Sequence, residues 1–339
     1  MPTLEIIGNV QNIMRKIVLS ILAYSTALLP LTAQKVDYSV VSVNEESGLN
    51  FTKITNDNDA VCMPIVKRTA NRCTWLTNRI IGLSPDGAYL AFVSARDNTT
   101  NIFIKEPSKQ GGSIQRTHRQ SVLDFNYSPD GKYITFSEKN GKNNNLFQTD
   151  AKNGYVCRQI TSGSSDYSPI YSKDMTQIYF ARQETSGVSI WSQNMKDNFL
   201  STYTAGMNPC PCSDNKAVVC VRTEANGNTS IWKINSESGI EECIISDPQK
   251  SFSTPSISPD GKWLLLVGSS AISTGVNTYY YNTDIYVCHI DGTNLMQLTY
   301  HAADDLSPIW SNDGRAIYFI SQRGSSEGKA NVWKMNFDL

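Results

Sequence analysis

A four-residue turn motif recurs along this chain at a nearly constant interval, and it constrains the fold more than any other feature. The motif reads Ser-Pro-Asp-Gly at 84–87, 128–131 and 258–261. Degenerate copies that keep the Asp surround Asp174, Asp214 and Asp313. Consecutive Asp residues lie 40 to 53 residues apart, close to the roughly 40–45-residue period of four-stranded propeller blades. The chain is therefore predicted to be an array of small β units.

Each residue of the motif suits a tight turn between antiparallel strands. Ser favours the first position, Pro presets φ at the second, and Gly takes a positive φ at the fourth. The copy around Asp174 has lost both Pro and Gly. We therefore expect this third turn to differ in geometry from the others.

Three strand signals follow each turn. Runs rich in β-branched and aromatic residues, such as 89–93, 263–267 and 317–320, predict a second strand after the turn. An aliphatic–aromatic pair then marks a third strand, at 102–103, 146–147, 190–191, 231–232, 285–286 and 332–333. A fourth segment ends in Thr in four units, at Thr117, Thr161, Thr204 and Thr299. Each unit is thus expected to hold four antiparallel strands.

The last unit has no room for a fourth strand of its own, because only six residues follow Trp333. Residues 50–55 match 294–299 in pattern, so a strand from the start of the chain can take that place. Such an arrangement removes exposed sheet edges. The predicted fold is all-β: a six-bladed β-propeller of four-stranded antiparallel blades, its ring closed by an N-terminal strand.

The first 33 residues read differently. Met14-Arg15-Lys16 precedes a short apolar stretch, 17–31, and a small residue, Ala33, stands before a polar one. This pattern predicts a secretory signal peptide over residues 1–33, with Met14 as a second candidate start. The alternative is an uncleaved membrane anchor, but the stretch is shorter than the roughly 20 residues that span a bilayer. We expect cleavage after Ala33, no membrane span in the mature chain, and a single propeller domain over 34–339.

The segment 305–314, with Leu298-Thr299 before it, resembles the repeat of TolB-like (WD-type) β-propellers. The resemblance spans roughly residues 49–339. It implies a periplasmic or secreted protein, since the family includes a periplasmic component of the Tol–Pal cell-envelope system. We do not expect the α/β domain that precedes the propeller in TolB, because about 15 residues separate the predicted leader from the first matching strand.

The charge of the chain limits the kinds of partner that are expected, and its cysteines suggest a disulfide. The chain has 30 basic and 31 acidic residues and no run of Lys or Arg, so a nucleic-acid partner is not expected. Among eight cysteines, Cys62 and Cys73 fall in the long connection before the first blade. In an exported chain, a disulfide between these two is a plausible pairing.

Signals for catalysis are few, and we expect a non-catalytic protein with no cofactor or metal. Gly324–Gly328 matches Gly-x-Ser-x-Gly, but no His follows it, so the context of a nucleophile elbow is missing. Oligogalacturonate lyases resemble this repeat and bind a metal through several His residues, which makes such a carbohydrate-active enzyme the alternative function. His118 and His301 follow the fourth strand of their units, yet a metal site needs more convergent ligands.

Binding residues are expected on the loops between second and third strands. Arg182 and Arg222 lie in or beside two such loops, and the fifth and longest contains Tyr279, Tyr280 and Tyr281. Tyr and Arg are frequent interface anchors. We therefore expect these five residues to form a patch for a protein or peptidoglycan-associated partner in the cell envelope.

Overall fold

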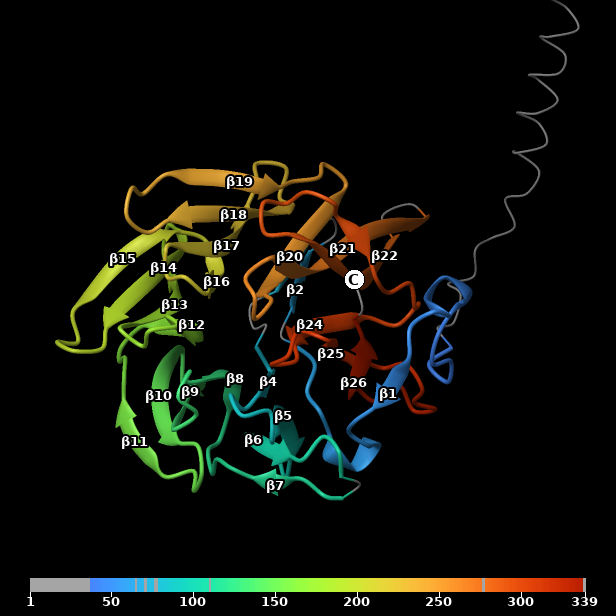
Figure 1. Cartoon of the computed structure of the whole chain (residues 1–339), viewed down its shortest axis with the longest axis horizontal. Coiled ribbons are helices and arrows are strands. Elements are labelled where there is room, and N and C mark those ends of the chain that lie inside the picture. The colour runs from blue at the N-terminus through green and yellow to red at the C-terminus, as the bar shows by residue number, and fades with distance from the viewer. Residues whose placement is uncertain are drawn as a thin grey trace, which may run out of the picture.

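The computed structural model describes residues 37–64, 66–69, 72–75, 79–109, 111–275 and 278–337. Within these ranges the helical elements are two 3-10 turns, η1 (Asn44–Glu46) and η2 (Asp57–Asp59). All other regular structure there is β-strand. The strands stand in chain order around a common axis (Figure 1).

By their antiparallel pairings most of the described strands group into units of four, and one parallel pairing, Asn144 opposite Ser165, joins the second unit to the third. The first unit holds β4 (Ile81–Leu83), β5 (Leu90–Arg96), β6 (Thr99–Lys105) and β7 (Ile114–Gln115). The second holds β8 (Val122–Tyr127), β9 (Tyr133–Asn140), β10 (Asn143–Asp150) and β11 (Val156–Gln159). The third holds β12 (Ser165–Tyr171), β13 (Gln177–Glu184), β14 (Gly187–Asn194) and β15 (Leu200–Ala205).

The remaining units follow the same plan. The fourth holds β16 (Met207–Pro211), β17 (Ala217–Thr223), β18 (Thr229–Asn235) and β19 (Glu241–Ile245). The fifth holds β20 (Lys250–Ile257), β21 (Trp263–Gly275), β22 (Thr278–His289) and β23 (Met296–Gln297). The last combines β24 (Asp305–Trp310), β25 (Ala316–Ser321) and β26 (Asn331–Asn336) with β1 (Phe51–Lys53). These sheets confirm the all-β propeller class that the repeat predicts.

The outer strand of the last unit comes from the start of the chain, in the region where the sequence pattern predicts it. Phe51 of β1 lies opposite Met335 of β26. Just beyond β1, the hydroxyl of Thr55 accepts the backbone N–H of Val332 at 2.8 Å. The same bond joins Ile102 to Thr117, Leu146 to Thr161 and Ile285 to Thr299. The recurring Thr therefore ties the fourth strand to the third.

The third turn corrects one expectation. Met175 has a positive φ of 61°, close to the 71° of Gly87 in the first turn. Its N–H donates to the carbonyl of Ser172, as the Gly87 N–H donates to the carbonyl of Ser84. The Ser172 hydroxyl also donates to Asp174 at 2.7 Å. The Ser–Asp bond and the turn hydrogen bond hold the geometry, so the loss of Pro and Gly leaves the turn unchanged.

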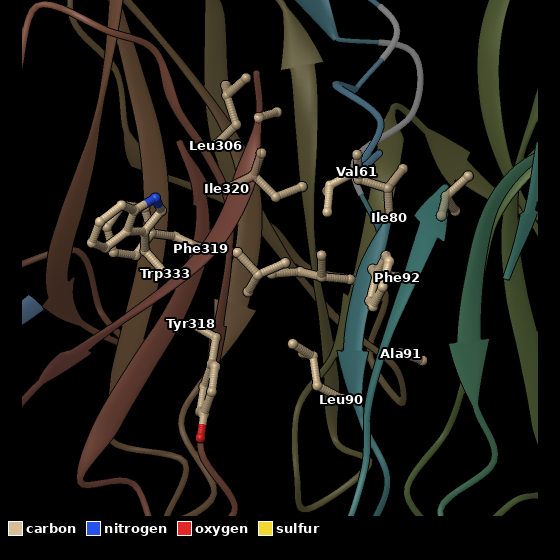
Figure 2. Close-up of a cluster of buried hydrophobic side chains, with 14 of the residues drawn as sticks. Val61, Ile80, Leu90, Ala91, Phe92, Leu306, Tyr318, Phe319, Ile320 and Trp333 are labelled. Carbon is tan, nitrogen blue, oxygen red and sulfur yellow. The ribbon is translucent and has the colours of Figure 1, made fainter. Parts of the chain in front are cut away.

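The first and last units pack directly against one another. Their inner and second strands share one buried apolar cluster, and Figure 2 shows Leu306 and Ile320 on one side of it and Val61 and Ile80 on the other. At the turns, the side-chain amide of Asn312 donates to the carbonyls of Ser84 (3.0 Å) and Pro85 (2.8 Å). Apolar burial and these two hydrogen bonds thus join the two ends of the array.

A further hairpin, β2 (Val66–Thr69) with β3 (Arg72–Trp75), precedes the first unit. Cys73 lies in β3, so the connection that contains it is more regular than the sequence suggests.

Candidate functional site

The ring has two faces, one at each end of its axis, and different connections between strands lie on each. Because successive antiparallel strands reverse direction, the Ser-Pro-Asp-Gly turns gather at one end, which we call the turn face. The connections between second and third strands, such as 322–330, gather at the other end, which we call the loop face.

The Asp residues of the turns are committed to turn geometry. Asp86 accepts from the hydroxyl of Ser84 at 2.5 Å and from the N–H of Ala88 at 3.0 Å. These bonds favour the carboxylate and hold the pKa of Asp86 below its ordinary value. The same bonding recurs at Asp130, Asp260 and Asp313.

A cavity of about 470 Å³ opens among the inner strands and turns, where the turn face meets the axis. Its wall is rich in proline and aromatic side chains, among them Pro85, Tyr127, Tyr171, Pro255 and Trp310. Of its described lining residues, the charged ones are Arg79 and Lys173. Its volume lies within the roughly 300–1,000 Å³ of small-ligand sites, and its charge favours an anionic group.

Arg79 reaches across this cavity. Its Nη2 donates to the carbonyl of Pro209 at 2.6 Å. Arg79 precedes β4 and Pro209 belongs to β16, two strands on opposite sides of the axis (Figure 1). The Cys210 thiol lies beside the guanidinium.

The sequence analysis did not single out Arg79, although a signal was present. Arg79 stands five residues before the Ser that opens its turn. The corresponding residues of the other units are uncharged: Leu123, Tyr167, Met207, Ser253 and Leu306. A charge at this position of the repeat, where the other copies carry none, marks a departure from the structural pattern.

Asp124 is the acidic group that faces Arg79. It is fully buried on β8 and accepts from the hydroxyl of Ser137 and, at 2.8 Å, from the N–H of Ser168. Burial raises its pKa to about 6, while those hydrogen bonds and the charge of Arg79 oppose the rise. Asp124 therefore changes charge close to neutral pH.

On the loop face, the two arginines of the predicted patch are engaged within the protein. Arg182 donates to buried Asp166 at 2.7 and 3.0 Å, and its guanidinium lies 4.3 Å from the ring centre of Trp191. Arg222 donates to Glu241 and stacks on Trp232 at 4.6 Å.

Such stacking recurs around the ring and has a structural role. In the other units the pairs are Arg96 on Phe103, Arg119 on Phe147, Lys250 on Tyr286, and Arg323 on Phe51. A cation over an aromatic ring contributes about 0.5–2 kcal/mol. Each unit thus covers an aromatic ring with a cation.

Tyr279, Tyr280 and Tyr281 lie in β22 rather than in a loop, which corrects the expected secondary structure. Their backbones pair with Ser273, Ile272 and Ala271 of β21, so the fifth unit extends as a long hairpin. Their side chains fall outside the described part of the chain. Arg182, Arg222 and these tyrosines come from three different units, and the patch that would combine them stays a prediction.

A buried charge cluster also lies toward the loop face. Fully buried Arg323 donates to Glu46 at 3.0 Å and to Asp305 at 2.5 Å, and so joins η1 to the last unit. Asp284 is 8 % exposed, and burial together with the charges of Asp305 and Glu46 raises its pKa to about 8. One cation therefore serves a group of three acids.

Cys62 is half-buried, and burial raises the pKa of its thiol to about 11. The side chain of Cys73 is not among those described, so the disulfide between them stays a prediction.

The histidines lie in unrelated settings. His118 is exposed, His289 packs on Trp263, and buried His301 accepts the N–H of Ala303 at 2.9 Å. Among the described residues, no group of three or more His, Cys, Asp or Glu is arranged to hold a metal ion. In the same residues, no helix is long and apolar enough to cross a membrane.

Comparison with known proteins places the architecture. The family model described as TolB beta propeller domain matches residues 33–275. The structure of putative TolB from Agrobacterium tumefaciens is 16% identical, with a TM-score of 0.57, over 86% of this chain and 98% of that one. TolB from Acinetobacter baumannii is 18% identical, with a TM-score of 0.54, over 68% of this chain and 56% of that one. Oligogalacturonate lyase from Vibrio parahaemolyticus is 12% identical, with a TM-score of 0.54, over 86% of this chain and 97% of that one. At these identities the solved structures show a shared fold.

Proposed function

The chain belongs to the TolB beta propeller domain family, and from this premise we propose that it is an exported, non-catalytic scaffold that binds a protein or other cell-envelope partner. We place it in the periplasm or outside the cell, as the signal-peptide pattern of residues 1–33 indicates. The observation that carries the proposal is the axial cavity, because a rigid ring there presents prolines, aromatics and two cations to one entering segment.

The cavity suits recognition for a physical reason. Its walls are inner strands fixed on both sides by neighbouring units, so little ordering entropy is lost when a ligand enters. Half-buried Tyr127 offers apolar contact area with few rotatable bonds, whereas Tyr171 and Trp310 are buried and form part of the wall. Lys173, exposed at the rim, adds attraction for an acidic segment.

The test is comparative capture from envelope extract. The intact protein, Lys173→Glu and Lys152→Glu serve as baits; Lys152 is also exposed but does not line the axial cavity. A partner of the cavity is retained by the intact protein and by Lys152→Glu, and lost from Lys173→Glu. Equal retention by all three baits would contradict the proposed location.

A second surface remains proposed on the loop face, at the β21–β22 hairpin. Three consecutive tyrosines would give it aromatic anchors. Arg182 and Arg222 would first have to leave Asp166 and Glu241. Replacing Tyr279, Tyr280 and Tyr281 together by Ser should weaken capture while thermal unfolding stays unchanged, because their strand segments extend past the blade core. Unaltered capture would remove the hairpin from consideration.

The alternative function is that of a carbohydrate-active lyase, which the likeness to oligogalacturonate lyases favours. One of those structures holds manganese. Incubation with oligogalacturonate and manganese, followed by absorbance of unsaturated products, tests it. Product formation above a boiled control would replace the scaffold proposal.

A further inference from the structure

Arg79 has hydrogen-bonding capacity that the protein leaves unused. One end of its guanidinium is bound, since Nη2 donates to the carbonyl of Pro209. The other end, Nη1, is buried and finds no acceptor within the described part of the chain. A buried donor without an acceptor costs about 1–3 kcal/mol, so such a group calls for a ligand.

A second donor close to the first is in the same state. Asn208 is 2 % exposed, and its Nδ2 also lacks an acceptor among the described residues. It directly precedes Pro209, whose carbonyl binds Arg79. The other end of its amide, Oδ1, accepts from the hydroxyl of Ser168 at 3.3 Å. Two buried donors without a described acceptor, one of them cationic, are therefore connected through the Pro209 carbonyl.

The cavity can deliver an acceptor to this place. Arg79 and Cys210 both line it, and the other described charge on its wall is the cation Lys173. The planar fork of a guanidinium binds carboxylates and phosphates alike, and of these two anions the carboxylate is the one that every unmodified polypeptide carries.

We propose that Arg79 anchors a carboxylate group that enters the axial cavity from the turn face. The inference deepens the proposed function, because it names the chemistry by which a partner segment would be held: an acidic side chain or a free C-terminus. A small free carboxylic acid shares that chemistry and is separated from a peptide by the test below.

Asp124 is the competitor for Arg79. It is fully buried and faces the guanidinium, and the other titratable groups around the pair are Tyr167 and Cys210. When Asp124 is ionised, it partly neutralises Arg79. Its pKa of about 6 means that it becomes protonated as the pH falls through that value. An incoming carboxylate should then bind more tightly.

Isothermal titration with defined probes tests the proposal on the full chain as isolated. The probes are glutarate, inorganic phosphate, and a short Gly/Pro peptide ending in Asp, with a free or an amidated C-terminus. We expect binding of glutarate and of the free peptide, with affinities that rise between pH 8 and pH 5.5. Tighter binding of the peptide than of glutarate identifies a polypeptide segment as the source. The absence of binding by every carboxylate probe would overturn the proposal, as would tighter binding of phosphate.

Two substitutions should move the affinity in opposite directions. Arg79→Gln should weaken carboxylate binding by about tenfold or more, because a charge-assisted bond is lost. Asp124→Asn should strengthen it at pH 7.5 and abolish the pH dependence. Arg116→Gln is the matched control: this outer-strand arginine donates to the carbonyl of Lys152 and is remote from Pro209 in the sheet order.

If one of the variants Arg79→Gln and Asp124→Asn fails to fold, the other is enough to test the carboxylate site. Unchanged binding by Arg79→Gln, or weaker or unchanged binding by Asp124→Asn, overturns the proposal. Loss of carboxylate binding in Arg79→Gln with full capture of an envelope partner would leave the scaffold function standing and separate it from this site.

Discussion

Asp284 lies at the centre of an electrostatic imbalance, since Arg323 is already shared by Glu46 and Asp305. One oxygen of Asp284 accepts from the amide of Asn282 at 3.1 Å, and the other has no partner among the residues described. Because its folded pKa of about 8 lies far above the ordinary value of 3.8, the proton is retained at neutral pH. The structure tolerates the acid mainly in its uncharged form.

The first prediction is that Asp284→Asn stabilises the protein, and increasingly so at higher pH. Between pH 4 and pH 8 the unfolded chain has released this proton while the folded chain keeps it, so ionisation costs stability as the pH rises. The substitution should add about 2–5 kcal/mol to the free energy of unfolding at pH 8 and almost nothing near pH 4. Urea unfolding across that range measures it.

Asp291→Asn is the control in the same unit. Asp291 is exposed and bonds to Thr293, which lowers its pKa. Its substitution should not reproduce the stabilisation that grows with pH. A flat difference between Asp284→Asn and the parent from pH 4 to pH 8 would refute the account of Asp284.

At the scale of the strand, most of the fold can be predicted from the sequence, because the same turn and strand residues recur in each unit. Turn residues, the aliphatic–aromatic pair and the closing Thr all reappear in the structure with fixed hydrogen bonds. The length of the β21–β22 hairpin was not foreseen, since Thr278–Asn282 lacks the alternation of a half-buried strand. These residues are nevertheless paired in the β21–β22 ladder, with Ile272 opposite Tyr280.

The second prediction concerns β1. Deleting residues 49–55 removes the outer strand beside β26, together with the Thr55–Val332 bond. It exposes the edge of β26 and part of the shared apolar cluster, so we expect a lower melting temperature and aggregation. Calorimetry and light scattering measure both.

The mature chain with residues 49–55 intact is the reference for both measurements. The closure argument fails if the 49–55 deletion melts at the temperature of the mature parent and stays monomeric.

At the scale of the whole molecule, the candidate site shows what a repeat pattern hides. The Arg and Tyr residues of the predicted loop-face patch looked available because a sequence shows residue type but not contacts. Arg222 in fact donates through all three guanidinium nitrogens. Arg79 was overlooked because its contact with Pro209 spans 130 residues of chain and depends on the ring being assembled.

The third prediction concerns export. If residues 1–33 are a signal peptide, the protein recovered from an expressing cell should start near Gln34, and intact-mass spectrometry reads this directly. The same sample, alkylated before and after reduction, reports on Cys62 and Cys73. A retained leader would contradict export, and two freely alkylated thiols at these positions would contradict the disulfide.

The pairing of β1 with β26 also sets an order of events in time. One sheet contains both β1 and β26, the first and the last strand in the described part of the chain. Whatever the earlier units do as they emerge, this sheet cannot form until synthesis reaches Asn336. Its contacts span nearly the whole chain, and contacts between distant residues form slowly. One unit of the nascent chain therefore stays unfinished, with the edge of β1 unpaired, until Asn336 has been made.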